Sequence, residues 1–247
     1  TDLGAEGGLT EDLATRIMVH DKGNDLLSHP RAWKTLTTVT VDDPLGKKTA
    51  AGVAGYQMEA MTVWIYENIY FGLMHVLTMG ELTGAEGRVS VVDPDKRPET
   101  DVIDFYLGTS RDAVNFDRRW IYARKPFIPR GPDRSFDKGI LQATTEIITR
   151  GDEHLIYYAG FYGQHHGPMS ANNLGGQIGL AKLRLDGFIS LEAGDEWGQV
   201  QTKPFKLEGD TLEVNVDASQ GEILVEVLDA LDKPYQGYGD GSSRIFK

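Results

Sequence analysis

Short apolar stretches rich in Val, Ile, Tyr, Phe and Thr recur along the chain, and glycines, prolines and polar residues separate them. Residues 61–77, MTVWIYENIYFGLMHVL, hold two such stretches on either side of Glu67 and Asn68. This is the spacing of a β-hairpin. Because β-branched and aromatic residues between turn-forming residues are typical of strands, the pattern predicts an all-β fold.

The order of strands and loops appears twice. After the first hairpin, a polar loop over residues 80–101 leads to strand-like segments at 102–110 and 120–128. The second passage holds predicted strands at 139–149, 154–162, 177–185 and 188–194. Small sheets repeated in this way are the construction of a β-propeller, so the pattern predicts propeller blades.

From residue 202 onward the sequence pattern changes, and apolar and polar positions alternate. Leu212, Val214 and Val216, for example, are separated by single polar residues. A period of two indicates strands with one buried and one wet face. We therefore predict two domains. Residues 1–201 form propeller blades, in an incomplete set, and residues 202–247 form a small C-terminal β-sandwich-like region.

Composition removes several classes of function. The 247 residues carry a formal net charge of -12, which disfavours nucleic acid and anionic membranes as partners. No apolar run is long enough to cross a bilayer. The absence of cysteine leaves the compartment open, with a secreted or periplasmic location expected. The chain starts at Thr1 without an initiator Met or signal peptide, which suggests a processed or truncated end.

Five ordered segments lie between residues 58 and 238: MTVWIYENIYFGL, DFYLGTSRDAVNFDRRW, KPFIPRGPDRSFDKGI, HLIYYAGFYGQHHG and IGLAKLRLDGFISLEAG. They resemble landmarks of the five-bladed β-propeller glycoside hydrolases, the group containing the family 32 and family 43 enzymes. The resemblance implies hydrolysis of glycosidic bonds and a carbohydrate partner. It also implies that the chain matches the C-terminal part of such an enzyme, with the missing blades on another chain or lost.

Hydrolysis of a glycosidic bond requires two carboxyl groups beside the scissile bond. Glu59, just before the first predicted strand of a blade, is the leading candidate for the general acid, against the alternative of an exposed edge glutamate. Glu146 is the second, because it interrupts an otherwise uncharged strand. Asp101 and Asp104 frame the start of a strand, and we favour Asp101 for ligand contact, against a purely solubilising role. The family's first-blade aspartate has no counterpart here.

Two other acidic residues have expected structural roles. Asp112 lies in a Ser-x-Asp turn where its carboxylate would accept backbone N–H groups. Ala113 stands where the family usually has glycine, which favours a turn without positive φ. In the segment 125–139, we expect Arg130 and Asp137 to pair, with binding of a substrate hydroxyl or carboxylate by Arg130 as the alternative.

The adjacent His165 and His166 follow an aromatic segment that includes Tyr162 and precede a loop rich in Gly, Asn and Ser. Aromatic faces and short polar groups suit a sugar, so all three are candidates for a carbohydrate cleft. The alternative for the histidines is an ordinary loop position. Neighbouring strand residues point to opposite faces, which argues against a metal site. We expect no cofactor, with loosely bound Ca²⁺ left open.

Nucleotide-binding loops and hydrolase-elbow motifs are absent from the sequence. The rival to a glycosidase is a non-catalytic carbohydrate-binding or structural propeller module within a larger assembly. Fold analogy cannot choose between them. The chain is expected to act as a glycosidase only if another segment completes the propeller.

Overall fold

The computed structural model describes residues 18–22, 34–39, 56–78, 82–83, 88–89, 101–143, 146–164, 175–206, 208–239 and 244–246. The chain divides into two compact units, Thr1–Leu185 and Asp186–Lys247. The second unit begins at Asp186, whereas the sequence pattern set the domain boundary at residue 202. No helix among the described residues is long and apolar enough to span a lipid bilayer.

The described elements are almost all strands, which confirms the predicted all-β class. In the first unit they are β1 (Met18–Lys22), β2 (Lys34–Val39), β3 (Tyr56–Tyr66), β4 (Ile69–Thr78), β5 (Leu82–Thr83), β6 (Arg88–Val89), β7 (Val102–Ser110), the helix α2 (Arg119–Tyr122), β8 (Ile140–Ala143), β9 (Ile148–Arg150), β10 (Glu153–Phe161) and β11 (Gly176–Arg184). The second unit has β12 (Glu222–Leu224) and β13 (Arg244–Phe246).

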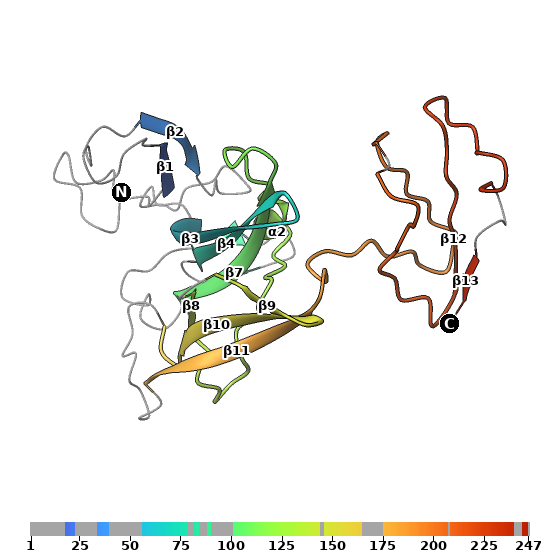
Figure 1. Cartoon of the computed structure of the whole chain (residues 1–247). Coiled ribbons are helices and arrows are strands. Elements are labelled where there is room, and N and C mark those ends of the chain that lie inside the picture. Colours follow the sequence, from blue (N-terminus) through green and yellow to red (C-terminus); the bar gives the residue numbers. More distant parts are fainter. Residues whose placement is uncertain are drawn as a thin grey trace. The chain divides into compact units, whose positions relative to one another are not determined.

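Seven strands form one sheet in the order β11-β10-β8-β7-β4-β3, with β9 also paired to β10 (Figure 1). Most neighbours are antiparallel, but β7 and β8 are parallel and meet at Ile103 and Ile140. This contact joins the two passages that were predicted as separate blades into one continuous sheet. The five-bladed propeller therefore stays a prediction.

The first hairpin matches its prediction. β3 and β4 are antiparallel and joined by the two residues Glu67 and Asn68, with φ of 46° and 60°. Positive φ at both central residues belongs to the type I′ turn, whose twist matches that of the strands it connects. β4 is buried from Phe71 to Thr78 on both faces, so the hairpin supplies a central strand of the sheet.

The sheet curls into a half-barrel. The ring of Tyr66 on β3 lies edge-on to the ring of His154 on β10, with centroids 4.9 Å apart. Four strand spacings separate β3 from β10 in the sheet order, which would be about 19 Å in a flat sheet. The contact is therefore made across the concave face.

Apolar and aromatic side chains fill this concave face. The rings of Trp64 and Phe71 stack at 5.5 Å, and Phe105 contacts His75 and Tyr158 at 4.8 and 6.4 Å. The opposite face is covered by residues of α2 and the turn before it. They form a cluster with the sheet that includes Met58, Met74, Val76, Tyr106, Phe116 and Ile121.

Three predicted strands differ from the structure. Residues 120–128 form α2 and a turn instead of a strand, because Arg124 adopts φ of 53° and Pro126 has no N–H for a ladder. The predicted strand 139–149 is interrupted after Ala143, and its two parts, β8 and β9, pair with the same edge of β10. Residues 188–194 contain no strand.

Candidate functional site

The site is built on the connector, which we define as residues 127–139 between α2 and β8. Its first part follows the edge of β7, where the Phe127 N–H donates to the Phe105 carbonyl over 2.7 Å. Its last part reaches β10, where the Gly139 N–H donates to the Phe161 carbonyl over 3.0 Å. Pro129 and Pro132 in the connector, and Pro126 just before it, restrict φ and remove donors, so the connector forms an ordered loop instead of a strand.

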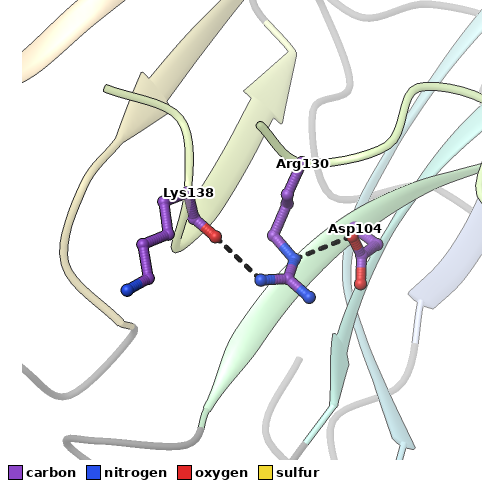
Figure 2. Close-up of polar contacts among 3 residues, drawn as sticks. All are labelled: Asp104, Arg130 and Lys138. Carbon is purple, nitrogen blue, oxygen red and sulfur yellow. Dashed lines mark hydrogen bonds and ion pairs between the residues drawn. The ribbon is translucent and has the colours of Figure 1, made fainter. Parts of the chain in front are cut away.

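Arg130 links the connector to β7 (Figure 2). Its Nε donates to the Asp104 carboxylate over 2.9 Å, and its Nη1 donates to the Lys138 carbonyl over 2.7 Å. The side chain of Asp104 is 13% exposed, so solvent screens this pair less than a surface ion pair. The two bonds fix the plane of the guanidinium group.

Lys138 connects Arg130 to an aromatic ring. Its carbonyl accepts from Arg130, while its Nζ lies 5.6 Å from the centre of the Tyr162 ring. The same Nζ is 2.7 Å from the Asp133 carboxylate. That hydrogen bond raises the pKa of Lys138 and lowers the pKa of Asp133. Two residues proposed from the sequence to bind substrate, Arg130 and Tyr162, are therefore brought together through Lys138.

A buried carboxylate lies beneath this surface. Asp137 is 6% exposed and accepts a hydrogen bond from the Tyr158 hydroxyl over 2.8 Å and another from the Ser135 hydroxyl. Burial, followed by the bond to Asp137, raises the pKa of Tyr158 to about 12. A Cβ at Gly160 would lie 2.5 Å from the Asp137 Cβ, so only glycine lets β10 approach the connector this closely.

The predicted pairing of Arg130 with Asp137 is wrong. Arg130 bonds Asp104 on the neighbouring strand, and Asp137 points inward to Tyr158. Asp137 is the acid nearer to Arg130 in the sequence. Because the start of the connector runs antiparallel to β7, the more distant Asp104 comes within reach of Arg130 instead.

In the turn after β7, the predicted hydrogen bonds from backbone N–H groups to Asp112 are confirmed. The Asp112 carboxylate accepts from the N–H groups of Val114 and Asn115 and from the Ser110 hydroxyl. These bonds, led by that from the Asn115 backbone, hold the pKa of Asp112 well below its ordinary range. Ala113, however, has φ of 59°. The expectation that alanine avoids positive φ is wrong, because the tight turn imposes this conformation on whichever residue occupies it.

The candidate acids Asp101 and Glu146 lie at different levels of the sheet. Asp101 is fully buried just before β7, and Glu146 is exposed between β8 and β9. β7 and β8 run parallel through the pair Ile103 and Ile140. Asp101 lies two residues before Ile103, whereas Glu146 lies beyond the end of β8 at Ala143, so the described register does not bring these two residues side by side.

Glu59 occupies an irregularity of β3 between Met58 and Ala60 and is half-buried. The neighbouring residue Met58 is level with Val76 on β4, which is level with Asp104 on β7. Two strand spacings, about 10 Å, separate these rows. Glu59 is therefore closer in register to the Asp104–Arg130 pair than to Glu146.

His165 and His166 lie outside the described residues. Within the described part of the chain, no group of three His, Cys, Asp or Glu side chains gathers as a possible metal site. The expectation that the protein uses no metal or other cofactor stays a prediction.

Sequence reasoning missed Lys138 and the bond between Asp137 and Tyr158. Lys138 is adjacent to Asp137, but the ring it contacts follows 24 positions later, just after the end of β10. Only the pairing of the connector with β10 brings them together, and no local pattern indicates that pairing.

Comparisons with models of protein families, with curated proteins and with solved structures find no match for this chain.

Proposed function

We propose that this chain is the carbohydrate-binding part of a glycoside hydrolase-like protein, completed by a further segment or another chain. Its sugar-binding surface is the Arg130–Lys138–Tyr162 cluster. The observation that carries the proposal is the link between an aromatic ring and a fixed guanidinium group through the single residue Lys138.

The chemistry of the cluster suits a sugar. Pyranose rings present C–H faces that pack on aromatic rings, and hydroxyl groups that accept hydrogen bonds from cationic side chains. Arg130 is held in place by Asp104 and by the Lys138 carbonyl. Because these bonds exist before any ligand arrives, binding loses less side-chain entropy at this position.

Binding to a panel of oligosaccharides, measured by calorimetry, tests the proposal. We expect Tyr162→Ala to weaken binding at least tenfold, because it removes the ring that a sugar would cover. Tyr157→Ala is the matched control, since Tyr157 is 38% exposed on the outward face of β10, the strand that ends just before Tyr162. Failure of every oligosaccharide to bind, or an equal loss in both variants, would overturn the proposal.

Hydrolysis of a glycosidic bond by a carboxylate pair is the second candidate. It is favoured by the register, which places Met58, the neighbour of Glu59, two strands away from Asp104 on β7, because the mechanism needs two carboxyl groups on either side of the scissile bond. In this scheme Glu59 donates the proton and an ionised aspartate activates water, with Glu146 and Asp101 as the other candidates from the sequence.

Aryl glycosides and oligosaccharides serve as substrates for this second test. We expect Glu59→Gln to lower the rate at least a hundredfold, because an amide cannot donate the proton. Glu67→Gln, in the exposed turn of the same hairpin, is the control. An unchanged rate in Glu59→Gln removes Glu59 from the mechanism.

A further inference from the structure

Positive charge is concentrated in one segment of an acidic chain. Residues 118–138 contain seven Lys or Arg and two Asp, whereas the whole chain has a net charge of -12. We call the basic side chains of this segment the basic strip. Its members are Arg118, Arg119, Arg124, Lys125, Arg130, Arg134 and Lys138.

The strip lies along a single strand. Just before it, the Asp117 N–H donates to the Thr109 carbonyl over 2.8 Å, and within it Phe127 is bonded to Phe105. At its end, the Gly139 carbonyl accepts from the Ile103 N–H over 3.3 Å. These anchors lie along about 20 Å of β7, so the segment that carries the basic residues is held along the length of this strand.

Part of this charge is compensated and part is not. Arg119 pairs with Asp117, Arg130 with Asp104, and Lys138 with Asp133. Within the described ranges, Arg124 and Lys125 form no ion pair. The Asp133 carboxylate, whose charge interacts with Arg134, already binds Lys138.

The backbone at two of these arginines is unfavourable. Arg124 and Arg134 have φ of 53° and 73°, in the left-handed region that bulky residues rarely adopt. Such conformations persist where the surroundings hold them, and they concentrate at ligand-binding sites. Both arginines thus occupy the strip at a conformational cost that a glycine or asparagine in the same turn would reduce.

We propose that the basic strip binds an acidic oligosaccharide, one that carries carboxylate or sulfate groups. This inference rests on the proposed carbohydrate-binding function and specifies its ligand class. Guanidinium groups bind such oxyanions through paired hydrogen bonds, and Tyr162 at the end of the strip offers a ring for a sugar face. The net charge of -12 disfavours a long polyanion such as nucleic acid, whereas a short acidic oligosaccharide needs to contact only the strip.

Calorimetry with three probes tests the inference: oligogalacturonate, its neutral methyl ester, and a sulfated oligosaccharide of similar length. We expect at least one acidic probe to bind ten times more tightly than the neutral ester, and the two acidic probes distinguish carboxylate from sulfate recognition. Raising NaCl from about 50 to about 200 mM should weaken acidic-probe binding several-fold, because salt screens the charges.

The triple variant Arg124→Gln, Lys125→Gln, Arg134→Gln should lose at least tenfold in affinity for the acidic probe. The control is Lys203→Gln, Lys206→Gln, Lys233→Gln, which removes the same charge from exposed positions of the second unit. Equal losses in the two triple variants would overturn the assignment to the strip.

The inference and the proposed function fail in different ways. If the neutral ester binds as tightly as both acidic probes, the acidic ligand class is wrong while carbohydrate binding stands. If none of these probes binds and the wider oligosaccharide panel also gives no binding, both proposals are wrong. Affinity for an acidic peptide equal to that for oligogalacturonate would also overturn the inference, because it would show that charge alone is recognised.

Discussion

The two units of the chain use similar β-forming sequences with different results. In the first, β3, β4 and β7 to β11 pair into one sheet and bury a large set of side chains. In the second, β12 pairs with β13 over three residues, and Leu191, Trp197 and Leu231 are exposed. Alternation of apolar and polar residues therefore predicts a buried strand only where partner strands supply both the ladder and the covering face.

Residues 212–216 illustrate this difference. Leu212, Val214 and Val216 alternate as cleanly as the residues of β10, yet they form no strand in the structure, and Leu212 is 54% exposed. β10 has β11 on one edge and β8 and β9 on the other. The predictions that follow test whether stability is concentrated in the first unit as this comparison implies.

The largest effect is expected at Phe105, which is 0% exposed and contacts both His75 and Tyr158. Phe105→Ala should lower the free energy of unfolding by about 3–5 kcal/mol, because it removes a large ring from the concave face and leaves a cavity. Urea unfolding followed by circular dichroism measures this. A loss below about 1 kcal/mol would mean that this face is loosely packed.

Acid should also destabilise the first unit through His75. Burial lowers the pKa of His75 from an ordinary 6.5 to about 4. Above pH 6.5 the residue is neutral in both states and has no effect. Between pH 6.5 and 4 the unfolded state binds a proton on this histidine that the folded state excludes. As the pH is lowered through this range, the free energy of unfolding therefore decreases, by about 3 kcal/mol in total.

Comparison with His75→Gln isolates this contribution, because the carboxylates titrate in both proteins. The difference in unfolding free energy between the two proteins should shrink as pH is lowered from 7 to 4.5. Because the second unit contains no histidine, its own signals should not show this dependence. A difference that stays constant with pH would contradict the burial of His75.

A smaller effect is expected under the connector. Tyr158→Phe removes the hydroxyl that donates to Asp137 and leaves a buried carboxylate with one fewer partner. The expected loss is about 1.5–3 kcal/mol, the range for hydrogen bonds to charged groups. Tyr70→Phe, on the opposite face of the same sheet, is the control and should change stability less. Equal losses of unfolding free energy in the two variants would show that the Tyr158–Asp137 hydrogen bond does not contribute to stability.

The sequence predicts the strands of the first unit better than their arrangement. The segment 102–110 coincides with β7, and the residues 154–162 and 177–185 are each shifted by one position from β10 and β11. Local patterns suffice there, because glycines and charged turns delimit apolar runs. The order of strands in the sheet depends on contacts between distant segments, such as Ile103 with Ile140, and no local pattern encodes them.

The candidate site could be predicted only in part. Arg130 and Tyr162 were chosen from their residue types and neighbours, and the structure connects them through Lys138. The partner of Arg130 was mistaken, because Asp104 lies 26 positions away and becomes adjacent only when the connector folds along β7. Residues that act through tertiary contacts leave a weak signal in the sequence.

The smallest effect is expected in the second unit. Leu231 is 76% exposed, and its N–H is bonded to the Asp229 carboxylate in a turn that needs no apolar side chain. Leu231→Ser should therefore change the free energy of unfolding by less than about 0.5 kcal/mol. The contrasting substitution is Leu107→Ser, at a buried position of β7, which should cost several times more. A loss above about 1 kcal/mol for Leu231→Ser would mean that another surface covers this leucine in solution, and the contrast between the two units would then reflect a missing partner for the second unit.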